Sequence, residues 1–293
     1  MMRDSFDGPI DNPISITTER YAAILGANPS KGARSPLLWN AGFAAAGIDA
    51  VMHPMDTTVE NLSTVIAALK ADRRYLGGAV TMPHKQAIAA HLDRLEPEAA
   101  RIGAVNAIYR DGDALVGANT DGAGALAQIE ELVGGANALA TKRALLIGLG
   151  GAGIAVAAYL AGHVASLMLA NRTRSVADEV AARLSSTAVD YPVSRRVLET
   201  IDLLVNATTI GHQDGLQGSP VSADDLGALP VGAVVYDIIY QPRETPLLRA
   251  AAARGLAVRD GLGMNLDQAV IAFVKANPAA LDMDAVRAAM LAA

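Results

Sequence analysis

A lysine and an aspartate at the ends of two expected strands are placed to do proton-transfer chemistry. In "GGAVTMPHKQ", Lys85 comes just past a strand, and in "GANTDGAG", Asp121 comes just past another. Open α/β sheets build their sites outside the carboxyl ends of their strands. If both side chains face one cleft, they form a polar pair able to move a proton to or from a substrate hydroxyl. The alternative for Lys85 alone is an ordinary surface lysine.

A glycine-rich turn predicts a nucleotide site. "GLGGAG" supplies Gly148, Gly150 and Gly153 as G-x-G-x-x-G, directly after the apolar "ALLI" and before "IAVAAYLA". At a strand-to-helix turn, the tight bend, the close approach to a pyrophosphate and the helix–strand contact each require a missing side chain. The alternative is that these glycines only permit tight packing.

The second strand of this unit ends in "NRTR" rather than in an acidic residue. About 20 residues after the glycine turn, an NAD site usually places a carboxylate against the ribose. Here Arg172 and Arg174 could pair with a 2′-phosphate, and Thr173 could donate a hydroxyl, which favours NADP over NAD. The alternative is two solvated arginines at a helix start, where positive charge is mildly unfavourable without an anion.

The stretch "NPSKGARSPLLWN", residues 28–40, has two interpretations. In one, Ser35 is a helix N-cap and Pro36 the first helical residue, where the missing N–H of proline costs nothing. In the other, Ser35 and nearby backbone N–H groups hold an anion at a helix start. The two can coexist.

Composition excludes several classes of function. The 293 residues suggest two domains of about 150 residues, and 52% hydrophobic residues provide a sizeable core. A formal net charge of −6 argues against nucleic acid as a partner. Zero cysteines exclude disulfides, thiolate metal sites and a cysteine nucleophile; with no export signal, a cytoplasmic location is expected. The histidines show no metal-ligand spacing, so no metal is expected, and residues 1–16 are interpreted as a loose arm.

Residues 144–170 form an uncharged run longer than the roughly 18 residues that flag a membrane helix. The run divides into a short apolar strand, a glycine turn, a helix and a second strand. Because buried parallel strands are continuously apolar, a soluble β-α-β unit is the preferred interpretation.

Strands and helices alternate along the chain, which predicts parallel sheets in two α/β lobes with a cleft between them, joined by a helix that begins at Asp121. Strands are expected at 20–26, 50–56, 75–81, 144–147, 166–170, 202–208, 233–239 and 256–261, with a further pair within 104–120 joined at Asp111-Gly112. Helices are expected at 36–46, 59–71, 121–133, 176–184, 245–255, 265–275 and 283–292, with a short one from residue 83.

The ordered segments "VTMPHK", "AVNAI", "NTDG", "GLGGAG", "NRT", "NAT", "YQPRETPLL" and "GLGM…Q" resemble the shikimate dehydrogenase family from about Gly26 to Phe273. The resemblance implies a two-lobed α/β fold. An N-terminal substrate-binding lobe, residues 14–120, would be completed by C-terminal helices in 264–293, and residues 121–263 would form a Rossmann-type lobe with a parallel sheet. It also implies reversible NADP-dependent oxidation of a ring hydroxyl of shikimate or a related cyclohexene carboxylate, a step of aromatic amino acid biosynthesis.

The same resemblance assigns roles by position. Lys85 and Asp121 would be the catalytic pair. The substrate site would be lined by Ser35, Thr81, Asn106, Tyr240 and Gln268, with Asn106 and Gln268 binding ring hydroxyls. The expected cofactor residues are Gly148, Gly150, Gly151, Ala152, Gly153, Asn171, Arg172, Thr173, Arg174, Thr208, Gly261 and Met264. Of these, residues 171–173 would hold the adenosine end and Met264 would lie near the nicotinamide.

The chain departs from the family pattern in the carboxylate loop, usually P-x-x-H-S-x-S-P-x-x-H. Gly32, Ala33 and Trp39 stand for its first histidine, first serine and second histidine, and Ala79 replaces the asparagine of N-V-T-x-P. Val176 stands where a second basic cofactor residue is usual. These departures predict a divergent member with the same chemistry and an altered substrate pocket.

Three alternatives remain open. The enzyme could act on quinate or an aminoshikimate, with NAD as a possible cofactor; the chain could be a dinucleotide-binding sensor without turnover; or it could be another two-lobed dehydrogenase, such as a methylene-tetrahydrofolate enzyme. Retention of Lys85 and Asp121 disfavours the second, and "NTDG" with "GLGM…Q" disfavours the third. The expected partner is a small ring acid, and neither nucleic acid nor a membrane is expected. The expected oligomeric state is a monomer or a homodimer.

Overall fold

The structure, a computed structural model, describes residues 8–277 and 282–293. The chain forms two compact units, one running to Thr120 and including Leu266–Ala293, the other Asp121–Asn265. Each unit has its own six-stranded sheet.

The first unit contains a mixed sheet in the order β2-β1-β3-β5-β6-β4. Its strands are β1 Arg20–Gly26, β2 Ala50–Asp56, β3 Tyr75–Val80, β4 Arg94–Leu95, β5 Ala107–Asp111 and β6 Ala114–Ala118. β1 runs parallel to β2 and β3, but β5 runs antiparallel to β3 and β6. The expectation of parallel strands is therefore confirmed for β1, β2 and β3 and wrong for the pairing of β3 with β5, whereas the hairpin expected at Asp111-Gly112 is confirmed. The tight turn at Gly112, with φ of +60°, joins β5 to β6, and so short a connection can only join antiparallel strands.

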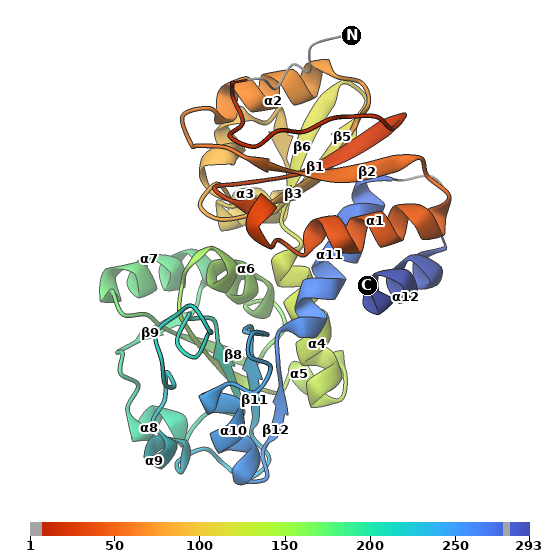
Figure 1. Ribbon diagram of the computed structural model, residues 1–293. Helices are drawn as coiled ribbons and strands as arrows, with labels where there is room; N and C mark the ends of the chain where they lie inside the picture. The colour runs from red at the N-terminus through yellow and green to blue at the C-terminus, as the bar shows by residue number, and fades with distance from the viewer. Residues whose placement is uncertain (1–7, 278–281) are drawn as a thin grey trace. The chain divides into compact units, whose positions relative to one another are not determined.

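Helices cover both faces of this sheet (Figure 1). They are η1 Pro29–Lys31, α1 Ser35–Ala46, α2 Leu62–Ala71, η2 Ala87–His91, α3 Pro97–Ile102, α12 Met283–Ala292 and the later part of α11 Leu262–Ala276. The helix expected from residue 83 is instead a turn followed by the short 3₁₀ helix η2.

The strands alternate their side chains between two cores. On one face Ala22 and Ile24 pack with α1, α11 and α12; on the other, Tyr21, Ala23 and Leu25 pack with α2. The period of two along β1 explains this division, since successive side chains of a strand point to opposite faces.

The second unit contains a fully parallel sheet in the order β12-β11-β10-β7-β8-β9. Its strands are β7 Arg143–Ile147, β8 Ser166–Ala170, β9 Thr187–Val189, β10 Leu203–Asn206, β11 Val234–Asp237 and β12 Ala257–Arg259. Numbered within the unit and read from β9, the order is 3-2-1-4-5-6, that of the Rossmann dinucleotide fold. Its ligand-binding crevice lies beyond the carboxyl end of the first strand, where the strand order reverses.

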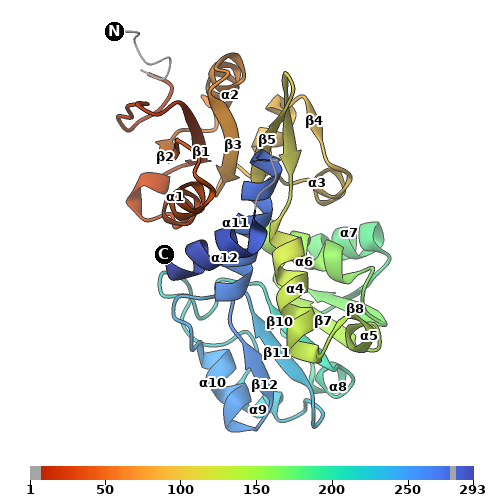
Figure 2. The same ribbon diagram turned by 90° about the vertical axis from the view of Figure 1, so that its right-hand side faces the viewer.

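The helices of this unit are α4 Asp121–Val133, α5 Ala136–Leu139, α6 Gly151–Leu160, α7 Arg174–Leu184, α8 Arg195–Leu198, α9 Ala223–Leu226 and α10 Pro246–Ala253. α4 packs alongside α6 (Figure 2), whereas α9 and α10 contribute to a core with β7, β10 and β11. Within the described residues, no helix is both long and apolar enough to cross a membrane. The uncharged run at 144–170 is β7, the glycine turn, α6 and β8, as expected.

Candidate active site

Backbone and side-chain hydrogen bonds connect the expected substrate residues of the first unit. The buried Asn106 accepts a 2.6 Å hydrogen bond at Oδ1 from the Thr120 backbone N–H, and its Nδ2 donates to Gln268 Oε1 at 3.2 Å. The Thr120 hydroxyl donates to the Gln268 carbonyl at 3.0 Å. Asn106 and Gln268 therefore lie together, and Thr120, which the sequence did not single out, binds both.

The same strand ends hold Thr81 and Lys85. Thr81 follows β3, and its N–H donates to the Leu25 carbonyl at 2.9 Å. The carbonyl of the half-buried Lys85 accepts a 2.7 Å hydrogen bond from Val105 N–H, one residue before Asn106. These contacts bring Lys85 to the strand-end region that carries Asn106.

Ser35 does not cap a helix. α1 begins at Ser35 itself, with Arg34 in the capping position and without a side-chain capping bond, so the N-cap prediction is wrong by one residue. Pro36 still lies in the first turn, where its missing N–H is tolerated. Among the described residues the Ser35 hydroxyl has no hydrogen-bond partner, so it is not used to cap α1.

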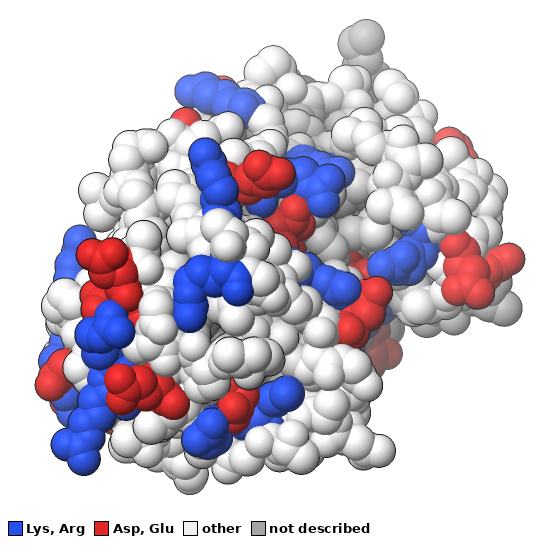
Figure 3. All heavy atoms as spheres, turned by 90° about the horizontal axis from the view of Figure 1, so that it is seen from below, with Lys and Arg blue, Asp and Glu red and all other residues white. Residues whose placement is uncertain are grey.

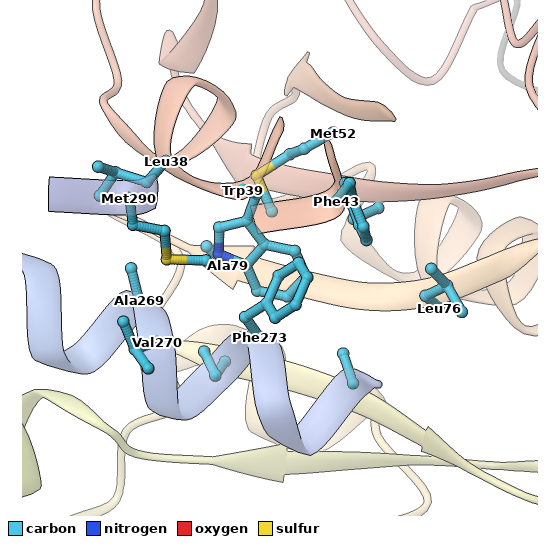
Figure 4. Packing of buried hydrophobic residues seen from close by; sticks show 14 of the residues in the cluster. Leu38, Trp39, Phe43, Met52, Leu76, Ala79, Ala269, Val270, Phe273 and Met290 are labelled. Atoms are coloured by element: carbon cyan, nitrogen blue, oxygen red, sulfur yellow. The ribbon is translucent and has the colours of Figure 1, made fainter. Parts of the chain in front are cut away.

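The departures from the family pattern pack together rather than being scattered. Trp39 is fully buried, with its ring centroid 6.0 Å from that of Phe43 and 5.3 Å from that of Phe273 of α11, in T-shaped arrangements. Ala79 belongs to the same apolar cluster (Figure 4), and Ala33 packs against it. The positions expected to carry an imidazole, an amide and a hydroxyl thus belong to, or pack against, one apolar core cluster.

In the second unit, a cavity of about 340 Å³ lies at the carboxyl ends of β7, β8 and β10. Its lining residues are Ile147, Gly148, Leu149, Gly150, Asn171, Arg172, Thr173, Tyr191, Ala207, Thr208, Thr209, Ile210 and Leu216. Six of the expected cofactor residues line it: Gly148, Gly150, Asn171, Arg172, Thr173 and Thr208.

The glycines of the turn serve different purposes. Gly148 has φ of +100°, and a Cβ there would lie 2.7 Å from Thr208 Cγ2. A Cβ on Gly153 would lie 2.0 Å from the Gly148 carbonyl oxygen. Gly150, by contrast, faces open space within the cavity wall. Its missing side chain leaves room at the N-terminus of α6, where Gly151, Ala152 and Gly153 form the first turn, and such helix starts bind phosphate.

Asn171 connects the two sides of the cavity. Its Oδ1 accepts a hydrogen bond from Leu149 N–H at 3.1 Å, and its Nδ2 donates to the Thr173 carbonyl at 3.1 Å. Thr173 occupies the N-cap of α7, yet its side chain makes no capping bond. The hydroxyl therefore remains for another partner.

The two arginines of "NRTR" differ in environment. Arg174 is held by Asp178, with Nε 2.8 Å from Oδ1, and by Asp190. It is not among the residues that line the cavity. Arg172 lines the cavity, is exposed, and pairs with no acidic side chain in the described parts of the chain. A basic group on the cavity wall suits an anionic ligand, and Arg172 supplies it.

A buried polar network beneath the cavity escaped the sequence reasoning, although "NAT" and "YDIIYQPRET" carry its residues. Asp237 accepts hydrogen bonds from Asn206 Nδ2 at 3.0 Å, from Ile239 N–H at 3.1 Å and from the Thr245 hydroxyl at 2.8 Å. Asn206 Oδ1 in turn accepts from the Thr208 hydroxyl at 2.8 Å. Burial raises the pKa of Asp237 to about 6 despite these bonds.

Tyr191 is a second residue that the sequence reasoning missed; it lines the cavity just after β9. Tyr240 is half-buried beyond β11 in the second unit, whereas the other expected substrate residues belong to the first. Gly261 and Met264 lie at the junction of β12 with α11 and do not line this cavity. A Cβ on Gly261 would lie 1.9 Å from the Ile238 carbonyl oxygen, so close strand packing requires this glycine.

Asp121 opens α4 and is buried, and Lys85 belongs to the first unit. Their pairing therefore stays a prediction. Within the first unit, the neighbouring residue Thr120 is fixed by Asn106.

Known proteins resemble this chain in both sequence and fold. The family described as "Shikimate dehydrogenase substrate binding domain" matches residues 25–108, and "Shikimate / quinate 5-dehydrogenase" matches 130–213. The shikimate dehydrogenase (NADP(+)) of Moorella thermoacetica is 41% identical over 86% of this chain and 85% of its own length.

Solved structures agree. The shikimate 5-dehydrogenase of Thermus thermophilus, in complex with NADP(H) and shikimate, superposes with a TM-score of 0.79 at 32% identity, over 93% of this chain and 99% of its own. The quinate dehydrogenase of Corynebacterium glutamicum, in complex with NAD, gives a TM-score of 0.82 at 29% identity, over 94% and 99%. The resemblance and the two-domain α/β fold expected from the motifs are confirmed, and this chain belongs to the shikimate dehydrogenase family of NAD(P)-dependent oxidoreductases.

Proposed function

We propose that the protein is an NADP-dependent dehydrogenase that reversibly oxidises a ring hydroxyl of shikimate or a closely related ring acid. The second unit would bind the dinucleotide and the first the ring acid. The observation that carries the proposal is the cavity beyond β7, which combines the open wall at Gly150 with the cation of Arg172, for which residues 8–277 and 282–293 provide no acidic partner. The relatives named shikimate dehydrogenase (NADP(+)) support the same reaction.

The residues present fit NADP. Phosphate oxygens would meet the N-terminus of α6 beside Gly150, Asn171 and Thr173 would hold the adenosine end, and Arg172 would face the 2′-phosphate. When bound, the nicotinamide supplies the hydride acceptor for alcohol oxidation. Val176 offers no second cation, so Arg172 would carry the preference for NADP.

The chain's own contribution to the chemistry is proton transfer and orientation. We assign Lys85 and Asp121 the proton of the reacting hydroxyl, because a Lys–Asp pair can both accept and return it. Asn106 and Gln268, already joined by a hydrogen bond, would bind the ring hydroxyls, together with Thr81 and Tyr240. The hydroxyl of Ser35 would reach the substrate carboxylate.

A quinate-like substrate is the second candidate, because Ala33, Trp39 and Ala79 replace the polar side chains usual in the family. Loss of the usual polar side chains would weaken binding of shikimate and leave space for a ring with different substituents. The quinate dehydrogenase of similar fold supports this possibility.

The test is a panel of ring acids (shikimate, quinate and an aminoshikimate) assayed with NADP and with NAD by nicotinamide absorbance. Turnover with NADP and at least one ring acid supports the proposal. Dinucleotide binding without turnover of any of them would contradict it and favour a sensor.

A further inference from the structure

The end of β2 carries a buried aspartate with an unusual set of partners. Asp56 is 6% exposed, and its carboxylate accepts two hydrogen bonds from Ser30, one from the backbone N–H at 2.9 Å and one from the hydroxyl. No lysine or arginine within residues 8–277 and 282–293 pairs with it. A buried carboxylate is costly unless it is hydrogen-bonded. The two hydrogen bonds from the loop residue Ser30 therefore replace hydrogen bonds to water that the Asp56 carboxylate lost on burial.

The N-terminal segment fixes Asp56 from the other side. The Asp56 N–H donates to Asn12 Oδ1 at 2.7 Å, and Asp11 N–H donates to the Asp56 carbonyl at 2.7 Å. The Thr57 hydroxyl donates to the Pro9 carbonyl at 2.9 Å. We call residues 9–12 the strap. The interpretation of residues 1–16 as a loose arm is thus wrong from residue 9 onward, and residues 1–7 lie outside the described residues.

Thr57 reaches the turn that carries Lys85. His84 is buried, and its Nε2 lies 2.8 Å from the Thr57 carbonyl oxygen. Because a carbonyl only accepts, Nε2 carries the proton. The Thr57 N–H donates to the Gly26 carbonyl at 2.9 Å, at the end of β1. Asp56 and Thr57 thus contact the segment before Ser35 on one side and the residue before Lys85 on the other.

The loop that leads to Ser35 contains the residue that Asp56 holds. Gly32 has φ of +134° with no neighbour near its Cβ position, and no side chain at this position can anchor the loop. The six residues from Ser30 to Ser35 are held at their start by the Ser30–Asp56 hydrogen bonds. Further along, Ala33 packs against the core and its N–H donates to the Pro29 carbonyl at 3.1 Å.

We propose that Asp56 and Thr57, held by the strap, are positioning residues that set the placement of Ser35 relative to Lys85 and so determine the affinity for the ring acid. The inference rests on the proposed function, because Ser35 and Lys85 are assigned to the substrate there. It adds that the N-terminal segment, which touches neither residue, tunes substrate binding.

The test uses Ser30→Ala in the full-length protein. This variant keeps the N–H bond to Asp56 and removes the hydroxyl bond. We expect the KM for the ring acid to rise about tenfold, which corresponds to about 1.4 kcal/mol. The kcat and the KM for NADP should stay within about twofold, since a single hydrogen bond outside the second unit is lost. Ser30→Thr keeps a hydroxyl and should restore the KM.

A matched control exists in the second unit. The Ser222 hydroxyl donates to Asp225 Oδ2 at 2.7 Å and accepts from the Asp225 N–H at 3.0 Å. Ser222→Ala therefore removes a serine–aspartate hydroxyl bond, together with the N-cap of α9, far along the chain. It should leave the ring-acid KM unchanged. Asn12→Ala, which removes the strap contact to the Asp56 N–H, should raise the KM in the same direction as Ser30→Ala.

Hydrogen exchange of residues 28–36 separates this inference from the proposed function. We expect faster exchange in Ser30→Ala and Asn12→Ala than in the wild type and Ser222→Ala. If no ring acid is turned over, the proposed function fails while faster exchange still supports positioning. An unchanged KM with unchanged exchange in Ser30→Ala overturns the inference. The inference is also overturned if Ser30→Ala lowers kcat and thermal stability as strongly as it raises KM, and if Ser30→Thr restores none of the three.

Discussion

At the scale of single residues, the structure distinguishes side chains that the sequence treated alike. Arg172 and Arg174 are two positions apart in "NRTR", yet only Arg172 lines the cavity beyond β7, whereas Arg174 is engaged by two aspartates. Likewise, Asn106 and Gln268 were assigned to the substrate from separate motifs, and a hydrogen bond joins them. Position along the chain identified these residues, but only their partners show which remain available to a ligand.

Lys85→Ala should lower kcat by about 10²-fold or more, the scale of general acid–base assistance, with cofactor affinity nearly unchanged. Asp121→Asn should have a similar effect. The double variant should be no worse than the poorer single one, because the two act as a unit. Steady-state kinetics and NADP titration of the three variants provide the measurement. Near-normal turnover in Lys85→Ala would remove it from the catalytic role.

Arg172→Ala should weaken the binding of NADP and leave the affinity for NAD nearly unchanged. A charge-assisted hydrogen bond to the 2′-phosphate contributes roughly 1.5–3 kcal/mol, which corresponds to about a 10- to 150-fold change in affinity. Arg174→Ala should have a smaller effect, since its guanidinium already pairs with Asp178 and Asp190. Fluorescence titration with NADP and with NAD measures these affinities. Arg183 is an exposed cation in the last turn of α7, so Arg183→Ala controls for the change in net charge. An equal loss for NADP and NAD in Arg172→Ala would show that the arginine is structural.

At the scale of elements, α1 and the loop before it combine catalysis-related positions with packing. α1 presents Leu38, Trp39 and Phe43 to the core shared with α11 and α12, while its first residue, Ser35, has a hydroxyl not used for capping. One element therefore buries the indole that replaces the family's histidine and presents the remaining serine. The sequence change at position 39 is accommodated because Ala79 is small and Phe273 lies against the indole.

Ala33→Ser should tighten binding of shikimate about 10- to 150-fold by restoring one charge-assisted hydrogen bond of roughly 1.5–3 kcal/mol to its carboxylate. Ser35→Ala should nearly abolish binding. Because Ser35 does not cap α1, its loss should leave the thermal midpoint almost unchanged, which separates a binding role from a structural one. The KM for shikimate and the melting curve of each variant are the measurements. A low-micromolar wild-type KM with no effect of Ala33→Ser would refute the altered pocket.

At the scale of the whole molecule, each unit is stabilised by its own core, and charges are distributed without a single-sign area on the face shown in Figure 3. Basic and acidic side chains alternate there, and ion pairs such as Arg143–Asp202 join charges of opposite sign elsewhere in the described residues. The buried Asp237 is different in kind. It joins β10, β11 and α10 through Asn206 and Thr245, so its ionisation bears on the stability of the second unit.

The unfolding free energy should fall as the pH rises from about 4 to about 6. Burial raises the pKa of Asp237 from 3.8 to about 6 in the folded protein, so in this window the folded state holds a proton that the unfolded state has released. The stabilisation is fully present below the lower value and lost above the upper one, and two pKa units correspond to roughly 3 kcal/mol. Urea unfolding at several pH values measures this contribution.

Asp237→Asn should flatten the pH dependence in that window. Asp202→Asn is the control, because the Arg143 guanidinium holds the pKa of Asp202 below its usual range, so this carboxylate acts only at more acidic pH and with the opposite sign. The same slope between pH 4 and 6 in wild type and Asp237→Asn would contradict the assignment.

Local pattern alone determined most of the elements. The continuous apolar run that follows Arg20, the glycine turn after "ALLI" and the Asp111-Gly112 turn each act over a few residues. For this reason β1, the start of α6 and the β5–β6 hairpin could be predicted from sequence. The motif order likewise determined the family, because each motif places chemistry at a strand end regardless of what packs around it.

Tertiary structure alone decided which side chains are held and by what. That β5 runs antiparallel to β3, that Asp56 holds Ser30 while residues 9–12 hold Asp56, and that Asp237 joins Asn206 to Thr245 all depend on residues far apart in the chain. The same holds for Trp39 against Phe273, which are brought together by α11. The physical reason is that hydrogen bonds and packing act over a few ångströms in space, whereas a sequence motif records only neighbours along the chain.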